Sequence, residues 1–421
     1  NFEEIDLVVV NFYPFEKTLE ETNRHKKIIE NIDIGGPTMV RAAAKNYNDI
    51  TVITNPEQYK DLIKELNTNK CKTSLKFRKK MSEIAFAETA YYDGLISNYF
   101  NSHSKNLFPK KKIFLGNLIE KLRYGENPHQ EGAIYSLKQE LSLKQLNGKK
   151  LSYNNYNDIF AALLISRSLP KNIGTVIIKH ANPCGVSINK NSLKSYKLAL
   201  ACDPISAFGG VVSCNYKIKK NLALELKKLF LEVIICKGID SKAIKILKNK
   251  KNLRIIDVSN LKNINLINIS SQFNSYLLQT SDTSIFSKSN FKVVSKIKPN
   301  SNTLKNLIFA FNICRFVKSN AIVISNSDST IGIGSGQPSR LDSCEIAINK
   351  MKKFYKEKKN DEIVAASDAF FPFVDGIEKL VQSGISAIIQ PSGSIKDKEI
   401  IRFANRTNTT LVFSKTRHFK H

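Results

Sequence analysis

Two side chains capable of acid–base and electrostatic chemistry, Lys179 and His180, stand next to each other after the apolar run of residues 176–178. Such a run is typical of a buried strand, and the Asn-Pro-Cys-Gly sequence at 182–185 favours a turn that ends it. Successive strand residues point to opposite faces, so both side chains can serve one ligand only where the strand has broken. The lysine cation favours neutral imidazole, the form that a general base needs. The alternative is a solvated lysine beside a structural histidine.

Four other segments combine polar side chains with residues that force an irregular backbone. Residues 121–130 include Arg123, whose planar guanidinium suits phosphate or carboxylate, and Tyr124, whose ring can stack on a ligand. Residues 332–336 read G-x-G-x-G, which lets backbone N–H groups approach an anion. A tight turn is the simpler interpretation, and the dinucleotide fingerprint is spaced differently. The last two segments, which mix polar and apolar groups where a planar ligand could lie, are residues 367–375 and 390–395.

The sequence around His180 also echoes the signature of zinc deaminases, which is H-x-E followed by P-C-x-x-C. Asn182 stands where the catalytic glutamate of that signature would be, and Ser187 stands where its second cysteine would be. The seven cysteines of the chain are scattered and form no CxxC pair, which argues for reduced thiols and against a cysteine-rich zinc site. We therefore expect no metal.

Taken together, these segments resemble the AICAR transformylase/IMP cyclohydrolase family of purine biosynthesis, where AICAR is aminoimidazole carboxamide ribonucleotide. The matching motifs stand in family order: RYGENPHQ from Arg123, LSYNNYND from Leu151, KHANPCG from Lys179, DPISAFGG from Asp203, SNSDSTIGIGSGQPSR from Ser325, SDAFFPF from Ser367, PSGS from Pro391 and RHFKH from Arg417. Residues 6–15 and 31–46 are similar to the later part of the family's cyclohydrolase domain. So many motifs in one order are not explained by a chance match.

The resemblance implies transfer of a formyl group from the co-substrate 10-formyltetrahydrofolate to the 5-amino group of AICAR, giving formyl-AICAR. It makes His180 the general base for the amine, and Lys179 the cation that stabilises charge on the formyl oxygen, with Asn320 donating to the same charge. Acyl transfer needs both functions. The nucleotide site would also include Arg123, Tyr124, Gly209, Glu232, Arg340, Phe370 and Arg417. The folate site would include Leu341, Asp375, Ser394 and Ile395.

The family's second activity, cyclisation of formyl-AICAR to IMP, concerns the N-terminal region. The resemblance implies Lys45 as a catalytic residue, with Asn11, Tyr13 and Asp33 around the base, although Lys45 could equally be an ordinary helix-face residue. The chain starts at Asn1, without an initiator methionine and close to its first strand. We therefore expect the first part of the cyclohydrolase domain to be missing and useful cyclohydrolase activity to be absent.

Alternating strand and helix patterns predict an α/β protein. The resemblance implies a truncated methylglyoxal-synthase-like α/β domain at residues 1–102, a linker at 103–114 and a transformylase region at 115–421. That region would consist of two cytidine-deaminase-like α/β subdomains, divided near residue 300. We expect strands at residues 7–10, 51–54, 175–179, 210–213, 233–236, 321–325 and 387–390, and helices at residues 20–32, 38–45, 76–100, 158–168 and 310–318.

The chain is strongly basic, with a formal net charge of +28 over 421 residues. Such a charge ordinarily suggests nucleic acid. The lysines are spread along the chain and concentrated in segments such as residues 242–268, where no aromatic residues accompany them, so we interpret them as lying on solvated faces. We expect no specific nucleic-acid binding but a modest steering of anionic substrates. A decayed basic protein that binds nucleotides or RNA is the alternative. No apolar run is long enough for a membrane span and no signal peptide is visible, so we expect a cytoplasmic protein. The resemblance adds a homodimer.

Overall fold

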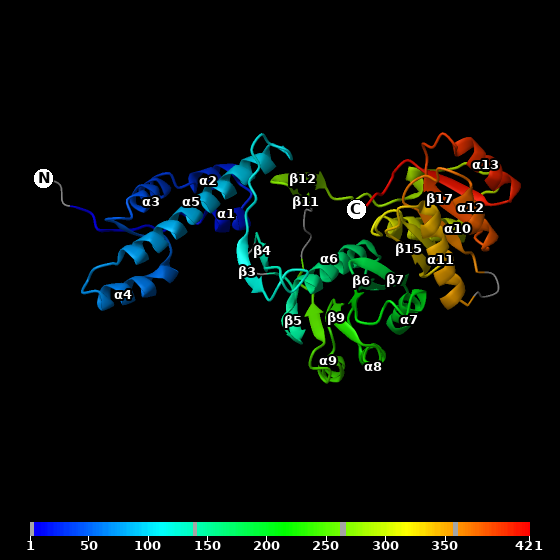
Figure 1. Cartoon of the computed structure of the whole chain (residues 1–421), viewed down its shortest axis with the longest axis horizontal. Coiled ribbons are helices and arrows are strands. Elements are labelled where there is room, and N and C mark those ends of the chain that lie inside the picture. Colours follow the sequence, from blue (N-terminus) through cyan, green and yellow to red (C-terminus); the bar gives the residue numbers. More distant parts are fainter. Residues whose placement is uncertain (1–3, 138–140, 262–266, 357–360) are drawn as a thin grey trace. The chain divides into compact units, whose positions relative to one another are not determined.

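The computed structural model describes residues 4–137, 141–261, 267–356 and 361–421. The chain forms two compact units, of which the first comprises Asn1–Leu118 and Tyr135–Gln139 and the second comprises Ile119–Ile134 and Glu140–His421. Figure 1 labels the helices and strands along the chain. Strands β3 (Asn117–Leu122) and β4 (Gly132–Ser136) pair with each other as a small sheet.

The first unit packs helices around a two-stranded parallel sheet. Strand β1 (Leu7–Val9) pairs in parallel with β2 (Thr51–Ile53). Small apolar side chains of α3 (Gly35–Lys45) pack with β2 and with the long helix α5 (Leu75–His103) in one buried cluster. The other helices of this unit are α1 (Phe15–Glu21), α2 (His25–Glu30) and α4 (Tyr59–Thr68).

One expected helix of the first unit was wrong. Residues 20–32 are not a single helix, because α1 ends at Glu21 and α2 begins at His25. Thr22 has extended backbone angles, φ −146° and ψ 150°, and its hydroxyl accepts a hydrogen bond of 3.2 Å from the Arg24 N–H. A β-branched residue whose side chain bonds the local backbone favours such a break. The sequence also failed to predict α4, whereas the other expected elements of this unit are present.

The first half of the second unit is a six-stranded mixed sheet with the order β5-β10-β9-β8-β6-β7. Strands β8, β9 and β10 run parallel, while β5, β6 and β7 pair antiparallel with their neighbours. The strands are β5 (Lys144–Asn147), β6 (Gly174–Lys179), β7 (Asn182–Ile188), β8 (Gly210–Cys214), β9 (Leu231–Cys236) and β10 (Arg254–Asp257). The helices are α6 (Tyr153–Ser168), α7 (Ser192–Cys202), α8 (Lys220–Leu226) and α9 (Ser241–Lys248).

The second half repeats this topology strand for strand. Its sheet has the order β13-β18-β17-β16-β14-β15, with parallel and antiparallel pairs at the same places. The strands are β13 (Phe291–Val293), β14 (Ile322–Ser325), β15 (Thr330–Gly334), β16 (Val364–Ser367), β17 (Ala387–Pro391) and β18 (Thr410–Ser414). The helices are α10 (Ser301–Cys314), α11 (Arg340–Phe354), α12 (Asp375–Gln382) and α13 (Asp397–Arg406), so the helix expected at 310–318 is only the end of α10. Equal order and direction in both halves indicate an internal duplication.

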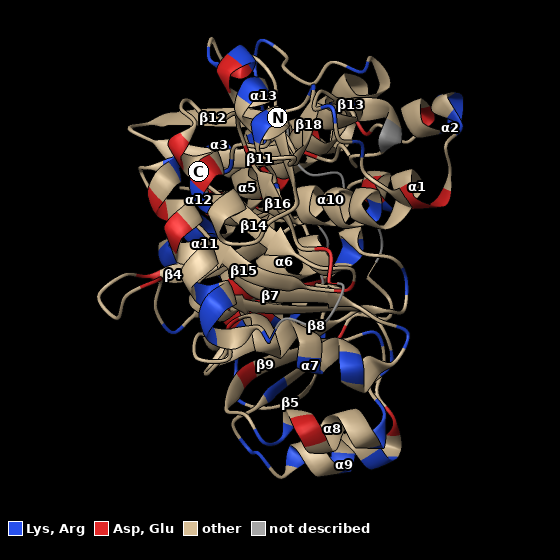
Figure 2. Cartoon of the chain, turned by 90° about the vertical axis from the view of Figure 1, so that its right-hand side faces the viewer, with Lys and Arg blue, Asp and Glu red and all other residues tan. Residues whose placement is uncertain are grey.

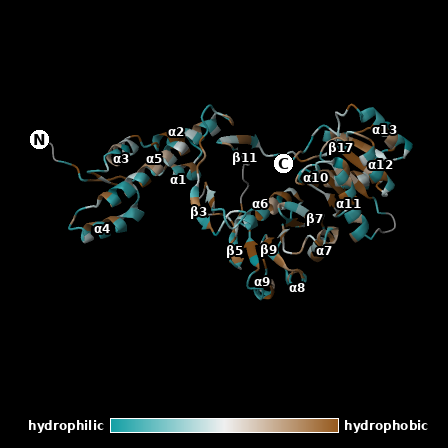
Figure 3. Cartoon of the chain, viewed as in Figure 1, coloured by the Kyte–Doolittle hydropathy of each residue, from teal (hydrophilic) through white to brown (hydrophobic). Residues whose placement is uncertain are grey.

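Each of the two sheets is covered on both faces. One face of the first sheet packs against α7, α8 and α9, and the matching face of the second packs against α11, α12 and α13. The opposite faces share a single core cluster that also contains apolar residues of α6 and α10. Figure 3 shows hydrophobic colouring on strands such as β9 and β17. Nearly continuous apolar sequence is what strands buried on both faces require.

The turn that follows β6 lies earlier than expected. Strand β6 ends at Lys179, His180 and Ala181 form a two-residue hairpin loop, and β7 begins at Asn182. The sequence at 182–185 is therefore the start of a strand and not a turn. Both loop residues have positive φ, 50° for His180 and 58° for Ala181, which is the feature that matches a two-residue hairpin to the twist of its strands.

The glycines at 332 and 334 lie inside a strand, so they form neither the tight turn nor the anion-binding loop that their spacing suggested. Both lie inside β15, and a Cβ would come within 2.2 Å of the Ala347 carbonyl oxygen at Gly332 and within 1.9 Å of the Ser343 carbonyl oxygen at Gly334. They allow α11 to lie closely against this strand. Only Gly336 of the three belongs to the loop after β15.

Charged side chains are distributed over the whole chain. Figure 2 shows Lys and Arg on many helices and loops, with Asp and Glu among them on α12 and α13. In this view the basic residues of the described ranges are not gathered into the single stripe that is typical of nucleic-acid-binding proteins. Within the described ranges, no helix is both long enough and apolar enough to cross a bilayer.

Candidate active site

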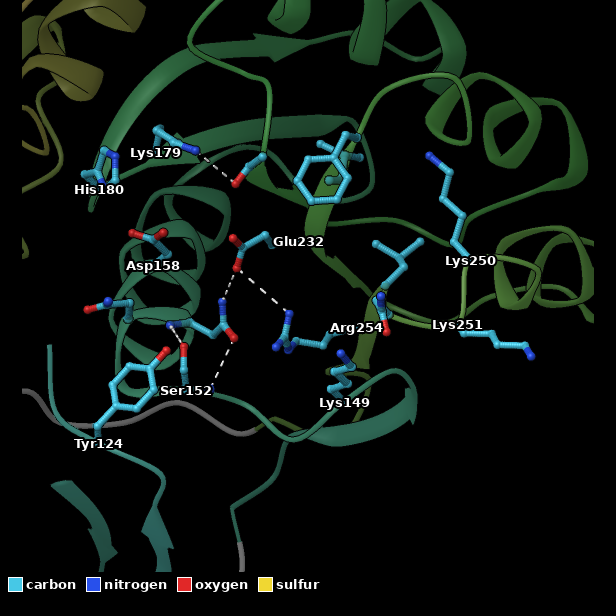
Figure 4. A pocket seen from close by; sticks show the side chains of 17 residues that line it. Tyr124, Lys149, Ser152, Asp158, Lys179, His180, Glu232, Lys250, Lys251 and Arg254 are labelled. Atoms are coloured by element: carbon cyan, nitrogen blue, oxygen red, sulfur yellow. Dashed lines mark hydrogen bonds and ion pairs between the residues drawn. The ribbon is translucent and has the colours of Figure 1, made fainter. Parts of the chain in front are cut away.

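A cavity of about 670 Å³ opens in the second unit beside the carboxyl end of β6. Five of the residues expected at the nucleotide and catalytic site line it: Tyr124, Lys179, His180, Gly209 and Glu232. Figure 4 shows the side chains of Tyr124, Lys179, His180 and Glu232 around this space, coming from the loop after β3, the β6–β7 hairpin and the start of β9. A cavity of this size can hold a nucleotide-sized ligand.

The hairpin loop presents His180 at this cavity. Asp158 of α6 fixes the loop, because its Oδ1 accepts a hydrogen bond of 2.6 Å from the Ala181 N–H. Asn182 Nδ2 donates to the His180 carbonyl at 3.3 Å. Histidine tolerates a left-handed backbone better than most residues, so it can occupy this loop with little strain. The exposed imidazole therefore stands on a short, well-anchored turn.

The ammonium group of Lys179 is held by two main-chain carbonyls. Its Nζ donates to Phe208 O at 3.0 Å and to Gly209 O at 3.2 Å. An ammonium has three N–H donors, so a third can point to a ligand. A cation fixed in this way is preorganised to stabilise negative charge that develops on a bound group.

Two carboxylates face the same cavity. Burial raises the pKa of Asp158, while a main-chain hydrogen bond and the nearby His180 oppose this shift and Glu232 adds to it. Asn155 Nδ2 donates to Glu232 Oε2 at 2.8 Å, and Arg254 Nη1 lies 3.9 Å from the same oxygen. The protein thus orients Glu232 as an acceptor, which suits hydroxyl groups of a ligand.

Sequence reasoning missed a group of cavity residues, namely Asp158, Lys149, Lys250, Lys251 and Arg254. Asn147 joins the segments that carry the basic ones, because its Nδ2 donates to the carbonyls of Lys250 at 3.2 Å and Leu253 at 2.8 Å. The signal was present, since Lys149 lies two residues before the LSYNNYND motif, but the lysine-rich stretch around 250 was interpreted as solvated surface. An excess of cations here favours an anionic ligand.

Asn320 and Arg340 belong to a hydrogen-bonded cluster in the second half. Arg340 is buried, pairs with Asp368 through Nη1, and donates from Nη1 to Ser367 Oγ at 2.8 Å and from Nη2 to Asn320 Oδ1 at 2.7 Å. Asn320 Nδ2 donates to the carbonyls of residues 337 and 338 at 2.9 and 2.8 Å. The contacts of Arg340 therefore orient Asn320.

The segment of Asn320 meets the loop of His180 through Asn182. Asn182 Oδ1 accepts a hydrogen bond of 3.2 Å from the main-chain N–H of Lys318, two residues before Asn320. An antiparallel bridge also joins β7 to the residue before β15. The two halves of the duplicated unit thus approach each other beside the histidine.

The family model of the AICARFT/IMPCHase bienzyme matches residues 43–350. The chain belongs to this family. The bifunctional purine biosynthesis protein PurH of Bradyrhizobium diazoefficiens is 42% identical over 430 residues, covering 99% of this chain and 81% of that protein. PurH of Aquifex aeolicus is 42% identical over 422 residues, covering 99% and 82%. PurH of Buchnera aphidicola is 44% identical over 441 residues, covering 99% and 82%.

A solved structure titled "Crystal structure of ForH" matches 23% of this chain and 50% of its own at 30% identity, with a TM-score of 0.19, which is too low to inform the fold.

The remaining residues expected at the nucleotide and folate sites of this AICARFT/IMPCHase chain do not line the cavity: Arg123, Asn320, Leu341, Arg340, Phe370, Asp375, Ser394, Ile395 and Arg417. Ile395 is 99% exposed and Phe370 is 36% exposed. The Arg417 guanidinium lies 4.4 Å from the ring centre of Phe419, and that of Arg123 lies 5.8 Å from the ring centre of Tyr124. The lining of this cavity therefore does not support the roles expected for these residues.

In the first unit, two of the four residues expected for the cyclohydrolase activity of the AICARFT/IMPCHase family lie close together. The Tyr13 N–H donates to Asp33 Oδ2 at 3.4 Å, and Asn11 Nδ2 donates to the Tyr59 hydroxyl at 3.1 Å. Lys45 is the last residue of the 11-residue helix α3, whereas Asp33 lies just before its first turn. At about 1.5 Å of rise per residue, roughly 15 Å of helix separates the two.

Proposed function

We propose that this chain transfers the formyl group of 10-formyltetrahydrofolate to the 5-amino group of AICAR. The observation that carries the proposal is the adjacent pair formed by His180 on its hairpin loop and the Lys179 ammonium held by two carbonyls, both facing one cavity. The amine nitrogen attacks the formyl carbon and the bond from that carbon to N10 breaks. The amine proton passes through His180 to N10 of the leaving tetrahydrofolate.

Different side chains remove the amine proton and stabilise the charge on the formyl oxygen in this proposal. His180 takes the amine proton as general base, which typically contributes roughly 10²- to 10⁴-fold. Lys179 stabilises the charge on the formyl oxygen, where loss of one such donor costs roughly 10²- to 10³-fold. Asn320 is proposed to donate to the same charge, for which its Nδ2 has to exchange one carbonyl partner for the substrate.

The proposed contacts to AICAR divide between the cavity and the second half. Tyr124, Glu232 and Gly209 line the cavity, and Arg123 lies beside Tyr124. Arg340, Phe370 and Arg417 are proposed to complete the nucleotide site, and Leu341, Asp375, Ser394 and Ile395 the folate site. We also infer that each half has a cytidine-deaminase-like fold, in keeping with the repeated mixed sheet.

A homodimer is part of the proposal. The hairpin of β11 (Ile267–Gln272) and β12 (Ser275–Thr280) exposes apolar side chains, with Phe273 99% exposed, Leu277 68% and Ile269 50%. Apolar groups gathered on a protruding hairpin favour burial against a second copy. Such a copy would also supply ligand contacts that one chain does not bring to the cavity.

Formation of tetrahydrofolate in the presence of both substrates tests the proposed reaction. We expect product to form only when AICAR is present, at a turnover within the usual range of about 1 to 10³ s⁻¹. Calorimetric titration with AICAR alone is the companion measurement. Binding without formyl transfer by a folded dimer would instead favour the decayed nucleotide-binding protein as the alternative.

A side chain at position 209 should displace the Lys179 ammonium. Its φ is 68°, and a Cβ would lie 3.0 Å from Lys179 Nζ. We expect Gly209→Ala to lower the free energy of unfolding by about 1–3 kcal/mol through backbone strain, and to lower kcat as well by displacing the ammonium. Urea unfolding and formyl transfer measure the two effects.

Gly384→Ala is the matched control for this substitution, because its φ is 88° and no atom lies within 4 Å of the added Cβ. It should show a similar loss of stability with normal kcat. Equal kcat for the two variants would mean that Gly209 is needed only for its backbone conformation and not for the position of the Lys179 ammonium.

A further inference from the structure

Lys350, in helix α11 of the second half, reaches across to the first half and pairs with Asp203. The distance between Lys350 Nζ and Asp203 Oδ2 is 2.8 Å, and the Asp203 side chain is only 4% exposed. Asp203 directly follows α7 as its C-terminal capping residue. The ion pair thus joins helices that belong to different halves of the duplication.

The Asp203 carboxylate organises the loop that follows α7. Its Oδ1 accepts a hydrogen bond of 3.0 Å from the Ser206 N–H, and its Oδ2 accepts one of 2.7 Å from Ser206 Oγ. The Ala207 N–H donates to the Asp203 carbonyl at 3.2 Å. Burial raises the pKa of Asp203, but the hydrogen bonds from Lys350 and Ser206 outweigh it and hold the pKa below its ordinary value. The carboxylate is therefore ionised at neutral pH.

The same loop ends on the carbonyls that hold the Lys179 ammonium. These are the oxygens of Phe208 and Gly209, at 3.0 and 3.2 Å from Lys179 Nζ. The loop closes through a hydrogen bond of 3.0 Å from the Gly210 N–H to the Ala207 carbonyl. A continuous series of contacts therefore runs from Lys350 through Asp203 and one short loop to Lys179.

We propose that the Lys350–Asp203 ion pair positions the Lys179 ammonium, so that the second half of the duplicated unit sets the geometry of the catalytic cation in the first half. This role rests on the formyl transfer proposed above. Neither Lys350 nor Asp203 is among the described residues that line the cavity. Both are positioning residues, because they act through the loop and do not touch substrate.

A double-mutant cycle on kcat tests the coupling between Lys350 and Lys179. We expect Lys350→Met to lower kcat by roughly 10- to 100-fold, because small displacements of a catalytic group are this costly. The KM for AICAR should change by less than about threefold, since ground-state binding is not altered. In a Lys179→Met background the second substitution should add little, because the group that it positions is already absent. Lys350→Arg should restore most of kcat, since a guanidinium can bind the same carboxylate.

Lys217→Met is the matched control, because Lys217 pairs with Asp240 at 2.6 Å, and both residues belong to the first half. It should leave kcat unchanged. The proposal is overturned if Lys350→Met lowers kcat by the same factor with and without Lys179, or if Lys217→Met has the same effect as Lys350→Met.

Acetylation of Lys179 by a water-soluble active ester, quantified by mass spectrometry, does not depend on formyl transfer. The two carbonyls hold the amine in place, so loosening the loop in Lys350→Met should make the amine more accessible to the ester and raise the acetylation rate of Lys179 roughly threefold. An unchanged rate overturns the positioning role. A raised rate in a protein that transfers no formyl group supports the positioning role and refutes only the proposed reaction.

Discussion

Replacing His180 with asparagine should slow formyl transfer by roughly 10²- to 10⁴-fold, because the substitution removes the general base. Asparagine is the sharpest choice, since it tolerates the positive φ of 50° at this position. The side chain is exposed, so no core packing is lost. Steady-state kcat and the KM for AICAR measure the effect, and the loss should appear in kcat.

His180→Ala controls for the loop itself. It removes the same base but places alanine at a positive φ. It should therefore lose as much rate as His180→Asn, and its free energy of unfolding should be lower than that of His180→Asn by about 1 kcal/mol. Thermal unfolding separates the two variants. Formyl transfer by His180→Asn within tenfold of the parent would assign the general base to another group, with Asp158, which accepts a hydrogen bond from the adjacent Ala181 N–H, as the next candidate in the cavity.

Replacing Arg340 with leucine should lower the free energy of unfolding of the second unit by about 3–5 kcal/mol, because it leaves a buried carboxylate without its cation. The side chains of Arg340 and Asp368 are 8% and 0% exposed. Asn320 Oδ1 would also lose the donor that lies 2.7 Å away. The chain has no tryptophan, so far-UV circular dichroism during urea unfolding is the suitable measurement.

An exposed ion pair provides the control for this loss. Lys396 and Glu399 lie 2.9 Å apart with side chains 42% and 50% exposed. Lys396→Met should cost less than about 1 kcal/mol, since solvated pairs contribute little. Arg340→Lys keeps a cation, so its loss in free energy of unfolding should lie between those of Arg340→Leu and Lys396→Met. This variant can be measured even if Arg340→Leu does not fold. A loss for Arg340→Leu no larger than that of Lys396→Met would mean that Ser319, whose Oγ lies 2.6 Å from Asp368, is a sufficient partner.

The residues proposed to react could be picked out from local patterns, whereas the contacts that support them could not. An apolar run followed by Lys179 and His180 is a local signal, and the structure confirms that a strand ends there. The turn itself was placed too late, because Asn-Pro-Cys-Gly has strong turn propensity. In the structure these four residues begin β7, which pairs antiparallel with β6. Pairing between strands overrides local propensity, as is common in sheets.

The role of the alternate glycines could not be predicted from local sequence either. Their spacing suggested an anion-binding loop, yet Gly332 and Gly334 lie in a strand against a helix whose carbonyls come too close for any Cβ. The basic residues around 250 were interpreted as solvated, although Asn147 brings them to the cavity. In each case the deciding neighbour is distant in the chain, so no local pattern could reveal it.

The amino-acid sequence by itself determined the α/β class, several of the strands and helices, and the motifs that place the chain in its family, because periodicity and motif spacing are local properties. The tertiary structure alone decided the repeated strand order of the two halves, the hairpin loop under His180, the burial of Arg340 and the Lys350–Asp203 contact. These features depend on which distant segments share a core or a hydrogen bond, and that is settled only when the whole unit packs.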